Sequence, residues 1–221
     1  MKVIAINGSP RKGWNTMQML EAAIDGAKSA GAEVELYHLY DYTYTGCKAC
    51  FACKRKSDAY PLRTCAVKDE LAPILAACAD ADAILIGSPI FFGNCPGHVL
   101  EFYERLIYPW SPYDAGPRSS CPHRIDYGVI FTLNQPDEHY KDGSAPTAKQ
   151  CMRLLGRMQG KGYCCAALNT TQFDDYEKFH ASRINVEAKK QQREAQFPKD
   201  LEEAREMGRQ LVLGLSTPVE G

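Results

Sequence analysis

The chain has 221 residues, a formal net charge of -1 at pH 7 and 45% hydrophobic residues. This length fits one α/β domain with additional segments, and the hydrophobic share is sufficient for a buried core. The near-neutral charge gives no electrostatic basis for binding nucleic acid or an anionic membrane, so neither is expected as a partner. The apolar run before Asn7 is too short for a signal peptide and no stretch approaches a membrane span, so we expect a soluble, cytoplasmic protein.

Short apolar runs alternate with stretches of helical periodicity, a pattern typical of a parallel sheet covered on both faces. In chain order, the predicted elements are a strand at Lys2–Asn7, a helix at Thr16–Ala30, a strand at Glu33–Leu39, a helix at Val67–Ala79, a strand at Ala83–Gly87, a helix at Pro96–Leu106, a strand at Asp126–Thr132, a helix at Ala145–Gln159 and a strand at Gly162–Leu168. Right-handed crossovers between these strands give a doubly wound, five-stranded parallel sheet in three layers.

Three segments extend this fold, which we expect to form a single domain over residues 1–221. A loop at 40–66 holds a cysteine group, an insertion at 109–124 is rich in proline, and a helical tail spans 181–214. Within the tail the periodicity predicts two helices, Arg183–Gln196 and Lys199–Gly214. They are separated at Pro198, because proline has no backbone N–H to donate inside a helix.

The residues between the first predicted strand and the first helix have the composition of an anion-binding loop. Gly8-Ser9-Pro10-Arg11-Lys12-Gly13-Trp14-Asn15-Thr16 begins at the carboxyl end of a strand, where α/β sheets bind ligands. The next helix offers unpaired N–H groups, and Ser9, Arg11, Asn15 and Thr16 supply further donors. Walker A and Gly-x-Gly-x-x-Gly motifs are both absent from the loop, so we predict a site for a monophosphate. The alternative is an ordinary turn with a threonine helix cap.

A second candidate loop follows the third strand. It combines flat apolar side chains with a glycine and an amide, as a planar ring requires, in the residues Pro89, Ile90, Phe91, Phe92, Gly93 and Asn94. Taken alone, such a run is more typical of core packing. Its place after the third strand puts it beside the first loop, which favours the ring site. We expect further contacts from Thr132 and Asn134, after the fourth strand.

The two loops together resemble those of the NADPH-dependent FMN reductase group of flavodoxin-like proteins. The first loop is similar to that family's phosphate loop, with Trp14 where a small residue is usual. The segment Ser88–Gly93 is similar to its Ser/Thr-Pro-Val-Tyr-Phe-Gly segment, with Phe91 where tyrosine is common. The resemblance implies a flavodoxin-like fold and flavin mononucleotide (FMN) held by the two loops. It also implies FMN-dependent redox chemistry, with NAD(P)H as one candidate reductant.

Four of the ten cysteines lie close together in the sequence. Cys47, Cys50 and Cys53 form a Cys-x2-Cys-x2-Cys pattern, and Cys65 follows after eleven residues. In a cytoplasmic chain, such a group is more typical of metal binding or redox chemistry than of disulfides. The triple spacing is that of the bacterial ferredoxin motif, whereas zinc usually takes two separate knuckles. We predict these four residues as ligands of a [4Fe–4S] cluster, with a zinc ion or no metal as the alternatives.

The place of this group, between the second strand and the second helix, resembles the iron–sulfur flavoproteins. In that family the loop binds a [4Fe–4S] cluster near the FMN of a neighbouring subunit. The resemblance implies a homodimer or homotetramer, and the insertion is a candidate interface. The gap before Cys65 is longer than is usual in the family. The nearby Lys48, Lys54, Arg55 and Lys56 either offset the charge of a cluster or form a solvated basic stretch.

These features predict an FMN-dependent oxidoreductase that exchanges electrons with a small-molecule or ferredoxin-like partner. A cluster-free NAD(P)H-dependent FMN or quinone reductase and a non-enzymatic flavodoxin-type carrier are the alternatives. A zinc-stabilised interaction module is a fourth interpretation. No side chain is predicted to act as an acid, base or nucleophile, because the protein's task is to hold the flavin and set its potential. The sequence assigns no role to Asn169–Phe179.

Overall fold

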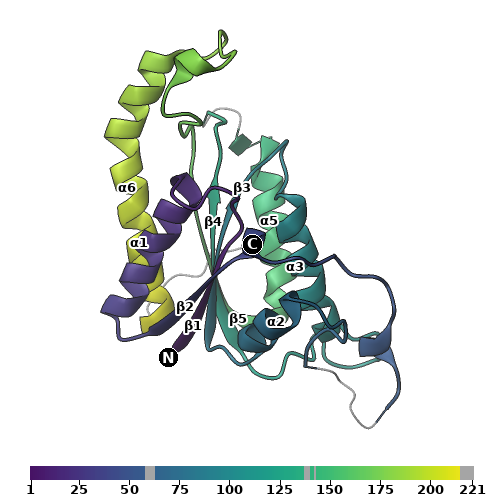
Figure 1. Ribbon diagram of the computed structural model, residues 1–221. Helices are drawn as coiled ribbons and strands as arrows, with labels where there is room; N and C mark the ends of the chain where they lie inside the picture. Colours follow the sequence, from purple (N-terminus) through teal and green to yellow (C-terminus); the bar gives the residue numbers. More distant parts are fainter. Residues whose placement is uncertain (58–62, 137–139, 142, 215–221) are drawn as a thin grey trace.

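The computed structural model describes residues 1–57, 63–136, 140–141 and 143–214 (Figure 1). Its five strands are all parallel and form one sheet in the order β2-β1-β3-β4-β5. The bounds are Lys2–Asn7 for β1, Glu33–His38 for β2, Ala83–Pro89 for β3, Ile125–Thr132 for β4 and Gln159–Ala167 for β5. This is the strand order of flavodoxin-like doubly wound folds, so the predicted fold class is confirmed.

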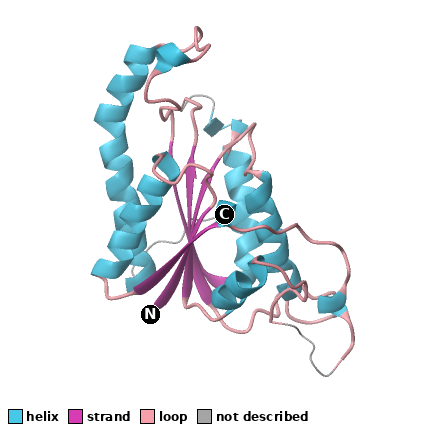
Figure 2. Ribbon diagram, viewed as in Figure 1, coloured by secondary structure: helices cyan, strands magenta, loops and turns pink. Residues whose placement is uncertain are grey.

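Helices cover both faces of the sheet, which gives the three predicted layers (Figure 2). One face is covered by α1 (Asn15–Ser29) and α6 (Val186–Leu213) (Figure 1). The other face is covered by α2 (Leu71–Ala79), α3 (Gly97–Ile107) and α5 (Ala145–Leu155). None of the helices in the described ranges is long and apolar enough to cross a membrane.

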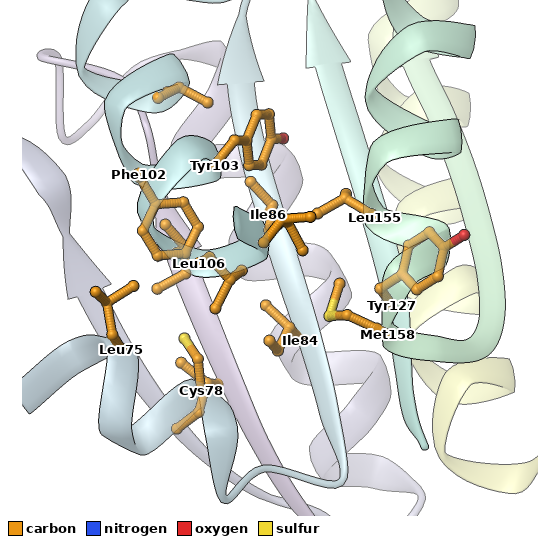
Figure 3. Close-up of a cluster of buried hydrophobic side chains, with 14 of the residues drawn as sticks. Leu75, Cys78, Ile84, Ile86, Phe102, Tyr103, Leu106, Tyr127, Leu155 and Met158 are labelled. Carbon is orange, nitrogen blue, oxygen red and sulfur yellow. The ribbon is translucent and has the colours of Figure 1, made fainter. Parts of the chain in front are cut away.

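The core on the second face lies between the sheet and its helices. Figure 3 shows Phe102, Tyr103 and Leu106 of α3 gathered against Ile84 and Ile86 of β3. These five side chains are at most 2% exposed. Burial of a large apolar side chain contributes about 1.5–3 kcal/mol, so this layer is a main source of the stability of the folded protein.

Most element boundaries lie within two residues of the sequence prediction, and two of the larger differences are at the starts of α2 and β5. Helix α2 begins at Leu71 and not at Val67, because the Asp69 side chain accepts a hydrogen bond from the Leu71 N–H (3.2 Å) and ends the preceding loop. Strand β5 begins at Gln159, within the predicted fourth helix. A 3-10 turn, Gly156–Met158, ends α5, and the positive φ of Gln159 (62°) redirects the chain into the sheet.

The predicted break of the tail into two helices is wrong, because α6 runs continuously through Pro198. A proline inside a helix costs about 3 kcal/mol through its missing N–H and its ring. On the same helix Phe197, Met207 and Leu211 are buried against the sheet and α1, and each contributes a comparable amount. Packing therefore outweighs the local preference.

Helices α1 and α6 lie side by side at backbone contact (Figure 1). A Cβ atom on Gly26 would lie 1.8 Å from the carbonyl oxygen of Arg205. One on Gly208 would lie 1.9 Å from the carbonyl oxygen of Ala23. The two glycines remove the side chains that would separate the helices. This contact fixes α6 so that its first half extends past α1 at the carboxyl edge of the sheet (Figure 1).

Candidate functional site

A cleft enclosing about 410 Å³ lies at the carboxyl edge of the sheet, next to the point where the strand order reverses between β1 and β3. In folds of this kind ligands bind at that point. Its walls come from the loop after β1 and from the segments that follow β3, β4 and β5. The lining residues are Ser9, Pro10, Arg11, Trp14, Asn15, Thr16, Pro89, Ile90, Phe91, Thr132, Leu133, Asn134, Thr170, Thr171 and Gln172. The structure thus brings three of the predicted segments together and adds a fourth, Thr170–Gln172.

The loop after β1 is shaped by its own hydrogen bonds. The buried Asn7 accepts a hydrogen bond at Oδ1 from the Ser9 N–H (3.1 Å), and Ser9 Oγ accepts one from the Arg11 N–H (3.2 Å). Trp14 occupies the N-cap position of α1, and no side chain in the described part of the chain caps this helix. The first-turn N–H groups and the positive end of the helix dipole therefore remain available to an anion.

Arg11 and Lys12, the two basic residues of the loop, point to different partners. Arg11 lies over the Trp14 ring (4.7 Å) on the wall of the cleft and donates Nη1 to the carbonyl of Gln172 (2.6 Å). Burial lowers the pKa of Arg11 from its ordinary value. Lys12 instead pairs with Asp41 at 2.7 Å, so Arg11 is the basic residue of this loop that lines the cleft.

The start of α1 is tied to the opposite walls through two side chains. Thr16 and Thr132 are joined by a hydrogen bond between their hydroxyl groups (2.6 Å), and both are buried. Asn15 donates Nδ2 to the carbonyl of Thr171 (2.7 Å) and accepts at Oδ1 from Arg193 of α6 (2.5 Å). The Asn15 side chain is thus engaged by the protein itself, and its place in the structure is to hold the segment after β5.

The segment after β3 forms a tight two-residue turn. Backbone hydrogen bonds link Phe91 and Asn94 in both directions (2.8 and 3.0 Å), and φ is positive at Phe92 (51°) and Gly93 (79°). This is the pattern of a type I′ turn, whose positive φ values favour glycine at the second central position. The Phe92 ring is fully exposed at the tip. Asn94 Oδ1 accepts from the Cys95 N–H (2.9 Å).

These residues divide between the cleft and a hollow beside it. Phe91 lines the cleft, whereas Phe92 and Gly93 line the adjoining hollow. Ile90, Leu133, Asn134 and Gln172 line both, so the two spaces lie side by side. The predicted residue Asn94 lines neither space.

Asn134 lines the cleft, and Lys189 of α6 lies behind it, bonded to residues of the cleft wall. Asn134 Oδ1 is buried and accepts no hydrogen bond from the described residues. The Lys189 ammonium, from α6, donates to the carbonyls of Asn134 (2.9 Å) and Thr170 (3.3 Å) and to Asn169 Oδ1 (2.5 Å). Its partners are therefore neutral, and burial lowers the pKa of Lys189 to about 8.

The sequence did not indicate Thr170–Gln172, Lys189 or Arg193 as site residues. Lys189 and Arg193 are four residues apart and so share one face of α6. This spacing could have been recognised in the sequence, but it does not predict which part of the protein that face of α6 contacts.

The four predicted metal ligands line a second hollow, of about 320 Å³, beside α3 and the 3-10 helix Tyr108–Trp110. The cysteine loop is fastened there by Lys54, which donates to the carbonyls of Tyr108 (2.5 Å) and Ser111 (2.7 Å) and lies over the Tyr108 ring. All ten cysteines are free thiols. Burial raises the pKa of Cys53. Residues 58–62 of the loop lie outside the described part.

Although they share this hollow, the cysteines do not form a ready-made metal site. The described residues contain no group of three or more His, Cys, Asp or Glu side chains placed to hold one metal ion. The hollow thus collects Cys47, Cys50, Cys53 and Cys65 around one space without bringing their sulfurs to metal-binding separations.

Comparisons with known proteins match both the sequence and the fold. An iron-sulfur flavoprotein from Archaeoglobus fulgidus is 43% identical over 105 residues, which is 48% of this chain and 48% of that protein. The chain thus spans about half the length of the curated relatives it matches.

Solved structures share the fold at low sequence identity. An NAD(P)H:quinone oxidoreductase from Methanothermobacter marburgensis superposes with a TM-score of 0.65 at 16% identity, over 98% of both chains. A flavodoxin from the domain Archaea gives 0.52 at 17% identity, over 97% of this chain and 98% of that one.

The family model for NADPH-dependent FMN reductase matches residues 1–118. That range is more than half of the chain, and it contains the loop after β1, the cysteine group and the turn after β3. The chain belongs to the NADPH-dependent FMN reductase family.

Proposed function

We propose that this protein is an FMN-dependent oxidoreductase that carries a [4Fe–4S] cluster on its cysteine loop. The observation that carries the proposal is the convergence, in one cleft, of an arginine with a helix end and a buried amide oxygen that have no side-chain cap and no hydrogen-bond partner, respectively, among the described residues. The first two suit a phosphate group, and the third suits the N–H edge of a ring. FMN has both features in one molecule.

The phosphate end of FMN fits the loop after β1. The first-turn N–H groups of α1 donate toward an anion, and the Ser9 hydroxyl and Arg11 guanidinium lie on the same wall. A monophosphate is a dianion near neutral pH, so it gains from each of these donors.

The ring end of FMN fits the part of the cleft that is formed by the segments after β3 and β4. Pro89, Ile90 and Phe91 supply apolar contacts, and Asn134 Oδ1 is left to accept a hydrogen bond. A buried acceptor without a partner costs about 1–3 kcal/mol, which a donor on the bound ring would offset. FMN supplies the redox chemistry when bound, and the residues of the cleft orient it and set its potential.

The cysteine loop supports the cluster part of the proposal through its ligand set. Cys47, Cys50, Cys53 and Cys65 line one hollow, and relatives that match about half of the chain are named iron-sulfur flavoproteins. The cluster would supply one-electron transfer to or from a small-molecule or ferredoxin-like partner, with NAD(P)H as a candidate donor. We also propose a homodimer or homotetramer, as the resemblance implies.

Anaerobically purified protein is expected to contain about one FMN per chain, with about four iron atoms and four acid-labile sulfides. Iron, sulfide and flavin assays on the same sample test this directly. The variant Cys50→Ser is expected to lose most of the iron and to keep its FMN. FMN without iron or sulfide in the wild-type protein would remove the cluster and leave the flavin assignment intact.

The phosphate assignment predicts a difference between two neighbouring basic residues. Arg11→Ala is expected to weaken FMN binding about tenfold, since it removes one charge-assisted interaction. The same change is expected to leave the binding of riboflavin, which has no phosphate, nearly unchanged. Lys12→Ala is the control, because Lys12 pairs with Asp41 away from the cleft. Equal effects of both variants on FMN, measured by fluorescence titration, would contradict the assignment.

A second candidate function is a cluster-free NAD(P)H-dependent FMN or quinone reductase. The observation that favours it is the lack, among the described residues, of side chains already grouped to hold a metal. It predicts rapid flavin reduction by NADPH or NADH. In that case the variants Cys50→Ser and Cys53→Ser keep full activity.

A further inference from the structure

Arg105 lies in the last turn of α3 with its guanidinium entirely shielded from solvent. Burying an arginine is costly unless its charge is paired and its donors are used. Asp69, at the start of α2, accepts from Nη1 (2.5 Å) and from Nη2 (2.9 Å) in a two-point contact. Hydrogen bonding from Arg105 holds the pKa of Asp69 below its ordinary value, so this carboxylate stays charged near neutral pH.

The same guanidinium also connects the two ends of the cysteine loop. Nη1 donates to the carbonyl of Thr45 (3.1 Å), and Nη2 donates to the carbonyl of Val67 (3.2 Å). Thr45 lies two residues before Cys47, and Val67 lies two residues after Cys65. Arg105 therefore closes the neck of the loop that carries all four cysteines. Its two Nη atoms make four hydrogen bonds, which is all that their N–H groups can supply.

One donor of Arg105 remains. Its Nε atom is buried and has no hydrogen-bond partner in the described part of the chain. Arg105 lines the hollow together with the four cysteines, and the Cys65 thiol interacts with its guanidinium. Burial alone would lower the pKa of Arg105, but the contacts with Asp69 and Cys65 raise it. The residue thus keeps a full positive charge at the wall of the thiol hollow.

We propose that Arg105 is the positioning residue of the cysteine hollow, closing the neck of its loop and directing its charge and free N–H toward the sulfur ligands of an anionic iron–sulfide cluster. The inference rests on the cluster part of the proposed function. Each cysteine loses its proton to solvent when its sulfur bonds iron, so cluster assembly concentrates negative charge in the hollow. A fixed arginine stabilises that charge, and the closed neck limits how far the cysteines can separate.

The test is anaerobic assembly of the cluster on the full-length chain from equal amounts of ferric and ferrous iron with sulfide, followed by iron and acid-labile sulfide assays. Arg105→Met is expected to retain less than about one fifth of the wild-type iron and sulfide. Arg105→Lys keeps the charge and is expected to restore at least half. Arg63→Met is the matched control. Arg63 lies two residues before Cys65, and its guanidinium pairs with Asp80 at the protein surface. FMN content reports folding of the flavin cleft in every variant.

A second readout separates a role toward the cluster from a purely structural one. Loss of a neighbouring positive charge is expected to lower the reduction potential of the cluster that remains in Arg105→Met, whereas Arg105→Lys stays closer to wild type. Unchanged potential and wild-type iron content in Arg105→Met would overturn the inference. Absence of iron and sulfide from the wild-type protein would instead end the cluster proposal itself.

Arg105→Met leaves Asp69 without its cation, so the variant can lose FMN through general unfolding. The double variant Arg105→Met with Asp69→Leu removes the stranded carboxylate as well. It is expected to retain FMN and still to lose most of the iron and sulfide. Full iron and sulfide in this double variant would also overturn the inference.

Discussion

Replacing Gly26 with alanine is expected to destabilise the protein by about 3 kcal/mol, measured as the free energy of unfolding in urea. The new methyl group would lie 1.8 Å from the carbonyl oxygen of Arg205, so α6 must move away from α1. Backbone atoms cannot give way as a flexible side chain can. Inside a helix, alanine is normally favoured over glycine by about 1 kcal/mol. Helix preference alone would therefore make Gly26→Ala more stable than wild type, so a loss of stability reports the contact between the helices.

A matched glycine gives the control for this substitution. Gly97 opens α3, and a Cβ there would meet nothing within 4 Å. Gly97→Ala is therefore expected to change stability by less than about 0.5 kcal/mol. Gly208→Ala, on the α6 side of the contact, is expected to match Gly26→Ala. If Gly26→Ala is as stable as wild type, the helices do not meet at backbone contact.

The same substitution has a consequence at the cleft. Helix α6 carries Lys189 and Arg193 to the segment after β5, and their positions depend on the contact between α1 and α6. We expect Gly26→Ala to weaken FMN binding along with stability. Gly97→Ala should leave FMN affinity unchanged.

Replacing Lys189 with methionine is expected to weaken FMN binding by about tenfold to a hundredfold at pH 7. The buried ammonium has three neutral acceptors around it, two of them on Asn134 and Thr170 in the wall of the cleft. No carboxylate is paired with the Lys189 ammonium in the described part of the chain, so its positive charge acts on an anionic ligand from behind the cleft wall. An interaction with a charged group contributes about 1.5–3 kcal/mol, which corresponds to the stated range.

The pH dependence of FMN binding gives a sharper test of Lys189. Without ligand, burial lowers the pKa of Lys189 to about 8, from 10.5 in the unfolded chain. At pH values between these two pKa values, Lys189 is mostly protonated in the unfolded chain and mostly neutral in the folded protein. The free energy of unfolding of the FMN-free protein therefore rises with pH over this range. FMN favours the charged lysine, so FMN affinity falls over the same range. The nearby Arg11 and Arg193 remain charged there, because arginine does not titrate near these pH values.

Lys190→Met is the matched control, since Lys190 is the next residue and is exposed. This variant should bind FMN as wild type does and keep the fall in affinity above pH 8. Lys189→Met should show little pH dependence between pH 7 and 10. An affinity in Lys189→Met that falls with pH as steeply as in wild type would exclude Lys189 as the titrating group.

The fold was predictable from the sequence because its signals are local. Strand β1 was predicted with its observed bounds, Lys2–Asn7, since an apolar run followed by Asn-Gly needs no distant contact to be recognised. The two loops predicted to bind FMN follow strands, and parallel strands place such loops at one edge. The same reasoning could not show that Lys12 is paired away from the cleft, because that pairing depends on Asp41, which lies beyond β2.

What the sequence by itself determined is the series of strands and helices, the loop after β1, the turn after β3 and the grouping of four cysteines. Each of these depends on residues within a few positions of one another. Only the tertiary structure decided that α6 continues through Pro198, that Lys189 and Arg193 hold residues of the cleft wall, and that Arg105 closes the cysteine loop. These features come from packing and hydrogen bonds between residues far apart in the chain, whose free energy exceeds the local preferences that a sequence pattern records.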